Sequence, residues 1–165
     1  MKYELRPEDL AFTERARFRR HCTGTVRAPA EAVFDQLARY PQNWPRWFGP
    51  ADDVHYEDPP PYGVGSTRFF RLYRVIRARE RIIAWDPGRH FAYRVHEANV
   101  PGVAAMIEEW TLTPSPGTGT TVGWTLAVDA GPLVDRLLRA GHRHIDQLFR
   151  QSMQRLEALC GHTRP

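Results

Sequence analysis

The sequence predicts an α+β domain in which a curved, seven-stranded antiparallel sheet wraps around one long C-terminal helix, with two short helices after the first strand. Alternating segments separated by turn residues fill the middle of the chain, which is typical of an antiparallel β-meander. Apolar residues recur at three- and four-residue steps over 132–160, which indicates a helix with a long apolar stripe. A sheet with one apolar face needs that face covered, and only this helix is long enough to do so.

The first strand and the two short helices lie in the N-terminal third of the chain. Residues 1–12 are polar, and we expect them to form a loosely attached lead-in. Residues 18–26 alternate between apolar and polar side chains, as a half-buried strand does. Pro29 suits the first turn of a helix, where its missing N–H is no loss, and a second short helical stretch covers 42–48.

Six further strands are expected between turns that are rich in proline and glycine. They lie near 53–57, 66–74, 76–85, 90–97, 104–113 and 120–129. The long helix follows, and Gly141 inside it predicts a kink or a close approach to the sheet. The helix side chains that should face the sheet are Leu138, Ile145, Phe149 and Met153.

Length and composition fit one domain over 1–165, with a core over about 15–160. Apolar residues make up 42% and charged residues 25%, so a core can form without disulfides or metals. The net charge of +4 comes from 23 basic residues, of which only Lys2 is a lysine. Because no dense basic cluster appears, we attribute the arginines to codon composition and predict no nucleic-acid partner.

Neither the cysteines, the histidines nor the N-terminus indicates a metal, a cofactor or a membrane. Cys22 and Cys160 lack metal-ligand or redox spacing, so we expect thiols in a reducing compartment. The seven histidines form no ligand motif, so we predict no metal and no cofactor. No apolar signal core is present, and no run approaches about 18 apolar residues. We expect a soluble, cytoplasmic protein without a membrane span, and leave a homodimer open.

Six short motifs occur in the order in which a known family carries them. They are residues 26–38 (VRAPAEAVFDQLA), 40–47 (YPQNWPRW), 63–66, 84–87, 117–121 and 155–159. In these motifs the chain resembles the START-related polyketide cyclase/dehydrase superfamily, SRPBCC. The resemblance covers roughly the predicted core and implies the helix-grip fold around an apolar ligand pocket. Members include aromatase/cyclases, lipid and sterol carriers and hormone receptors, and no stretch here matches a catalytic pattern, so no activity is implied.

A strongly curved sheet on a single helix leaves a gap between them, which large side chains should line. We expect a cavity of about a few hundred cubic ångströms, the usual size of a small-molecule site. The residues expected to bind a ligand there are Trp47, Phe70, Glu80, Tyr93, Met106, Glu108, Trp110, Trp124 and Phe149.

Glu108 is the one catalytic candidate, because it is in phase with Met106 and Trp110 on the face expected to be buried. A desolvated carboxyl there would have a raised pKa and could act as a general acid or base, or hold a ligand hydroxyl. The alternatives are a buried ion pair between Glu108 and an arginine, and a bulge that turns Glu109 inward instead.

Three further residues belong either to the site or to the scaffold. Glu80 is in phase with apolar neighbours, so it either joins Glu108 in one site or pairs with an arginine at the rim. Tyr93 either packs in the core or directs its hydroxyl into the pocket. Arg20 is expected to pair with one of the glutamates rather than to anchor a ligand carboxylate.

Three functions are compatible with these features. The first is binding of a small apolar or aromatic ligand, lipid- or polyketide-like, without catalysis. The alternative is a polyketide cyclase or dehydratase that uses the same cavity with an acid/base residue. The second alternative is an interaction module without a ligand, which would use the outward-facing Arg77, Arg79 and Arg81. Polar groups that converge in the pocket favour the enzyme over the carrier, whereas a filled core favours the interaction module.

Overall fold

One antiparallel sheet forms the frame of the protein in the computed structural model, which describes residues 1–117 and 119–161. The strand order is β2-β8-β7-β6-β5-β4-β3, and β1 pairs with β6. The strands are β1 (Tyr3–Glu4), β2 (Phe18–Val26), β3 (Ala51–Tyr56), β4 (Thr67–Leu72), β5 (Ile76–Asp86), β6 (His90–Ala98), β7 (Val103–Pro114) and β8 (Thr120–Ala130). The predicted fold class is confirmed, and the two-residue β1 adds an eighth strand to the seven expected.

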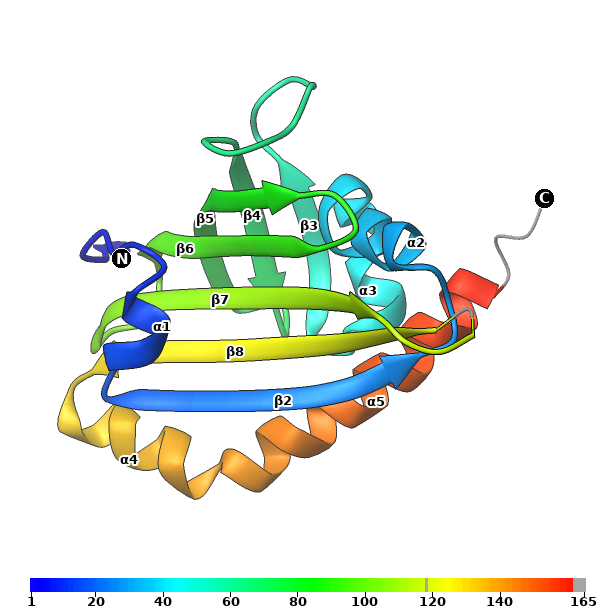
Figure 1. Ribbon diagram of the computed structural model, residues 1–165. Coiled ribbons are helices and arrows are strands. Elements are labelled where there is room, and N and C mark those ends of the chain that lie inside the picture. The colour runs from blue at the N-terminus through cyan, green and yellow to red at the C-terminus, as the bar shows by residue number, and fades with distance from the viewer. Residues whose placement is uncertain (118, 162–165) are drawn as a thin grey trace.

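One short helix lies against the outer face of the sheet, and the others lie at its end and across its inner face (Figure 1). They are α1 (Phe12–Arg15), α2 (Ala30–Phe34), α3 (Trp44–Trp47), α4 (Pro132–Ala140) and α5 (His142–Gly161). A π-helical turn, η1 (Asp35–Arg39), and a 3-10 turn, η2 (Pro41–Asn43), connect α2 to α3. The sheet curls strongly, so that β3, β4 and β5 stand apart from β2 and β8, with α4 and α5 running beneath β2.

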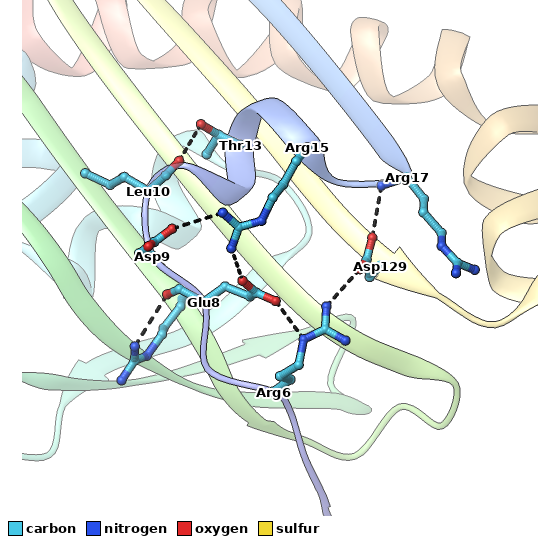
Figure 2. Close-up of polar contacts among 9 residues, drawn as sticks. Arg6, Glu8, Asp9, Leu10, Thr13, Arg15, Arg17 and Asp129 are labelled. Carbon is cyan, nitrogen blue, oxygen red and sulfur yellow. Dashed lines mark hydrogen bonds and ion pairs between the residues drawn. The ribbon is translucent and has the colours of Figure 1, made fainter.

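The N-terminal segment is anchored to the sheet, so the expectation of a loose lead-in is wrong. The side chains of Leu5 and Phe12 are buried, and Phe12 packs on the outer face of β7 and β8. Figure 2 shows the polar contacts: Arg6 Nη2 donates to Asp129 Oδ2 at 2.9 Å, and the backbone N–H of Arg17 donates to the same carboxylate. Two separate apolar residues in a polar segment give no periodicity, so the pattern could not reveal this attachment.

The C-terminal helix covers the inner face of the sheet and is divided at Gly141, as predicted. The four side chains expected to face the sheet all pack against the main core: Leu138, Ile145, Phe149 and Met153. Gly24 of β2 permits this contact, because a Cβ there would lie 3.2 Å from both Met153 and Phe149. Buried residues are found on α5, whereas α4 has none. The sheet is therefore covered more closely by α5 than by α4.

No helix within 1–117 and 119–161 combines the length and the apolar content that crossing a bilayer requires. Across the same part of the chain, no three His, Cys, Asp or Glu side chains gather in a way that could hold a metal ion.

Candidate functional site

A pocket of about 290 Å³ lies between the inner face of the sheet and α4. Strands β4 to β8 supply most of its walls, α4 contributes Val134 and Leu138, and α3 contributes Trp44. Most of the lining side chains are apolar, but the lining also includes the carboxyl groups of Glu80 and Glu108. The volume is at the lower end of the range for small-molecule sites. The pocket lies at the end of the sheet that α4 covers loosely.

The nine residues predicted to bind a ligand divide into two groups. Those that line the pocket are Phe70, Glu80, Tyr93, Met106 and Glu108. Those outside its lining are Trp47, Trp110, Trp124 and Phe149. The second group forms a packed aromatic cluster: ring centroids are 6.0 Å apart for Trp47 and Trp110, 5.7 Å for Trp110 and Trp124, and 5.9 Å for Trp124 and Phe149. These rings fill the inner face where α5 crosses it, and the pocket begins beyond them.

Glu108 lies on the inner face of β7, where two donors converge on one of its oxygens. Tyr93 is its cross-strand partner on β6, and the Tyr93 hydroxyl donates to Glu108 Oε2 at 2.9 Å. Trp124 of β8 donates to the same oxygen through Nε1, also at 2.9 Å. Both donors are neutral, so they orient the carboxyl without compensating its charge. The register of β6, β7 and β8 therefore places Tyr93, Glu108 and Trp124 together at the polar end of the pocket.

A second buried carboxyl, Glu80 of β5, is paired with an arginine. Arg68 is its cross-strand partner on β4, and Arg68 Nε donates to Glu80 Oε2 at 2.7 Å. The Arg68 side chain is 0% exposed, and its guanidinium lies over the rings of Tyr93 and Trp44, at 4.4 Å and 4.7 Å from their centroids. Such cation–π contacts partly replace the lost hydration of the charge. Arg68 thus holds Glu80 from behind the pocket wall.

Burial changes the protonation of both carboxyls. Desolvation raises the pKa of Glu108, against the hydrogen bonds from Trp124 and Tyr93. Desolvation raises the pKa of Glu80 to about 7, against the positive charge of Arg68, and the nearby Glu108 raises it further. Two carboxyls therefore share one guanidinium in a place that disfavours charge. The cluster can retain a proton near neutral pH, which is what a general acid or a hydrogen-bonding anchor requires.

The structure decides between the alternatives for Glu108 and Glu109. Glu109 lies on the outer face, where its Oε1 is 2.8 Å from His90 Nε2, and His90 lowers the pKa of Glu109. The irregularity in β7 falls between Val103 and Ala105, too early to change the phase at Glu108. The alternative in which a bulge turns Glu109 inward is therefore wrong.

Arg20 does not pair with a glutamate, and that expectation is also wrong. Its Nε donates to Asp146 Oδ1 of α5 at 2.6 Å. Arg20 lies on the edge strand β2, next to α5, and β8 lies between β2 and β7, the strand that carries Glu108. Arg20 therefore attaches the long helix to the sheet.

Two of the three outer-face arginines named in the interaction hypothesis, Arg79 and Arg81, are engaged within the chain. Arg79 Nε lies 2.9 Å from Glu57 Oε1, and Arg79 Nη1 donates to Glu97 Oε1 at 2.5 Å. Arg81 Nη1 donates to the carbonyl of Gly65 at 2.6 Å. Because two of the three arginines are occupied in this way, the interaction module is less supported than a function of the pocket.

Arg68 is the residue of this site that the sequence reasoning missed. It shares the phase of Phe70 and Leu72 in the segment that forms β4, so the alternation alone placed it on the inner face. A charged side chain is seldom fully buried unless it is paired, which argued against reading it there. The matching inward carboxylate, Glu80, was the signal that could have identified the pair.

Comparisons with known proteins agree with this architecture. Residues 19–161 match the family model described as polyketide cyclase/dehydrase and lipid transport. An uncharacterised protein of Mycobacterium tuberculosis is 35% identical over 124 residues, which cover 74% of this chain and 73% of the relative. The Zhui aromatase/cyclase of Streptomyces sp. R1128 has a TM-score of 0.68 at 20% identity, over 87% of this chain and 94% of that one.

A START superfamily protein from Mycobacterium smegmatis is similar in the same way, with a TM-score of 0.66 at 14% identity, over 86% of this chain and 98% of that one. At these identities the solved structures bear on the fold alone. The family match covers most of the chain, and it confirms the resemblance drawn from the six motifs. The chain belongs to the polyketide cyclase/dehydrase and lipid transport family.

Proposed function

We propose that the protein binds a small, mainly apolar molecule in the pocket between the sheet and α4. The observation that carries this proposal is the pocket itself, an apolar space of about 290 Å³ with Glu108 and Glu80 among its lining. An unfilled space of this size costs packing energy, and few precisely held polar groups in an apolar wall are typical of ligand sites. The family description, which includes lipid transport, supports the same function.

A second candidate function is a cyclase or dehydratase reaction in the same pocket. It is supported by the pKa of Glu108, which desolvation raises, since a carboxyl with a raised pKa is better able to protonate a leaving hydroxyl or a carbonyl oxygen. Tyr93 and Trp124 hold that carboxyl in one orientation, as an acid/base group requires. Binding is ranked first because it needs only the pocket, whereas turnover also needs a substrate placed against Glu108.

A cytoplasmic setting is part of the proposal. Cys22 is a thiol, which suits a reducing compartment. A lipid- or polyketide-like ligand would then be taken up from the cytoplasm or from a membrane surface facing it.

Filling the pocket tests the proposed function directly. Met106 lies on β7 between Val95 and Val128, and all three line the pocket. We expect the neutral dye N-phenyl-1-naphthylamine to bind the parent protein at one saturable site. We expect Met106→Trp to bind the dye at least about tenfold more weakly, because the larger ring occupies part of the space.

Thr113→Trp is the matched control, because Thr113 is an exposed residue of the same strand on the opposite face. This variant should bind the dye as the parent does, and both variants should keep the far-ultraviolet circular dichroism of the parent. Equal dye affinity in Met106→Trp and Thr113→Trp would place the dye on the surface and contradict the proposal.

A further inference from the structure

The polar atoms of the pocket wall divide unequally into donors and acceptors. Three donors near the pocket are already engaged: the Tyr93 hydroxyl and Trp124 Nε1 bind Glu108, and Trp44 Nε1 donates to the carbonyl of Leu37 at 3.0 Å. Arg68 Nη2 has no hydrogen-bond partner within the described residues, but the guanidinium is fully buried against aromatic rings and is not part of the lining. Among the residues that line the pocket, all of which the structure describes, no side-chain donor is left to bind a ligand.

Acceptors, in contrast, are left over. Glu108 and Glu80 both line the pocket, and each uses only Oε2 in the hydrogen bonds formed within the described part of the chain. Oε1 of each carboxyl accepts none of these bonds. A carboxylate oxygen can accept two hydrogen bonds, so the wall presents unused acceptor capacity on two strands.

The charges of Glu80, Glu108 and Arg68 also favour a ligand that donates hydrogen bonds. Arg68 compensates Glu80 at 2.7 Å, but the hydrogen-bond partners of Glu108 are the neutral Tyr93 and Trp124. A ligand carboxylate placed here would add negative charge to a site that water screens poorly and that already disfavours the charged forms of both Glu80 and Glu108. A ligand amine would supply the missing cation, and a ligand hydroxyl could donate to Oε1 of either carboxyl.

We propose that the pocket selects apolar molecules whose buried end carries a hydrogen-bond donor, a hydroxyl or an amine, and that it rejects carboxylates. This inference rests on the proposed function and specifies the class of ligand. It separates long-chain or aromatic alcohols and amines from fatty acids and aromatic acids, which have similar apolar bodies.

Four compounds with one apolar body test this selectivity: 2-methylnaphthalene, 2-naphthalenemethanol, 2-naphthylmethylamine and 2-naphthoate. Their affinities are measured at pH 7.5 by displacement of N-phenyl-1-naphthylamine. The alcohol and the amine are expected to bind about tenfold more tightly than 2-methylnaphthalene, the gain of one hydrogen bond to a charged group. The carboxylate is expected to bind at least about tenfold more weakly than 2-methylnaphthalene, because of charge repulsion and desolvation.

Glu108→Gln tests the residue, and Glu109→Gln on the outer face is the matched control. In Glu108→Gln the amine should lose its advantage and the carboxylate should regain about tenfold, while 2-methylnaphthalene changes less than about twofold. Glu109→Gln should leave all four affinities unchanged.

The outcomes separate this inference from the proposed function. If 2-methylnaphthalene binds and 2-naphthoate binds as tightly as 2-naphthalenemethanol, the selectivity is overturned and the binding function stands. Failure of all four compounds to displace the dye would overturn the proposed function, and the selectivity with it. An unchanged carboxylate affinity in Glu108→Gln would remove Glu108 from the account of selectivity.

Discussion

Arg68→Met is expected to lower the free energy of unfolding by about 3–5 kcal/mol, because it leaves Glu80 buried without its partner. Arg68 is fully buried, and besides Glu80 it donates to the carbonyl of Leu37 at 3.2 Å. Methionine keeps most of the length of the side chain but has neither its charge nor its donors. The change in stability can be measured by urea denaturation at pH 7.5.

Arg71→Met is the control on the same strand. Arg71 is partly exposed and pairs with Asp52, so its loss should cost less than about 1 kcal/mol. The double variant Arg68→Met, Glu80→Gln should recover part of the stability lost in Arg68→Met, because it removes the stranded charge. Equal stability of the Arg68→Met and Arg71→Met proteins would show that the buried pair is not what holds β4 to β5.

The stability of Glu80→Gln relative to that of the parent is expected to increase as the pH rises from 4.5 to 7. In the folded protein the pKa of Glu80 is about 7, above its ordinary value of 4.5, so the folded state binds more protons here than the unfolded chain does within that window. The stabilisation from protonated Glu80 is fully present below pH 4.5 and is lost as the pH passes 7. Glutamine stays neutral, so its relative gain should total about 3 kcal/mol.

Glu109→Gln provides a control of opposite sign. His90 lowers the pKa of Glu109, so the ionised carboxylate stabilises the folded state at higher pH, and this contribution is lost as the pH falls. The parent should therefore gain on Glu109→Gln as the pH rises towards 4.5, the ordinary pKa of the carboxyl, and little above it. A flat difference between the parent and Glu80→Gln from pH 4.5 to 7 would mean that Arg68 keeps Glu80 ionised throughout.

The alternation of the strands was sufficient to predict which face each candidate residue occupies. It placed Tyr93, Met106 and Glu108 on the inner face, where the structure has them beside the pocket. It could not predict depth along the strand, because residues two positions apart share a face. Trp110 and Glu108 are such a pair: Trp110 packs in the aromatic cluster near Phe149 of α5, and Glu108 reaches the pocket.

The rest of the site depends on contacts between distant segments. Whether Glu80 pairs with an arginine depends on the register of β4 against β5, which brings Arg68 opposite it. The pocket wall also includes Leu5, from an N-terminal segment whose polar composition hid its attachment. Side-chain period specifies neither a strand register nor the docking of an aperiodic segment.

The methionine methyl groups provide the most direct measurement of the central claim, that a small apolar molecule occupies this pocket. The chain has three methionines: Met106 lines the pocket, Met153 of α5 is buried outside the pocket lining, and Met1 is 96% exposed. In protein labelled with 13C at the methionine methyls, titration with 2-methylnaphthalene should shift the Met106 signal saturably, with one affinity. The Met1 and Met153 signals should move little. If a saturating concentration of 2-methylnaphthalene leaves the Met106 signal unchanged, or shifts the Met1 signal instead, the account is contradicted.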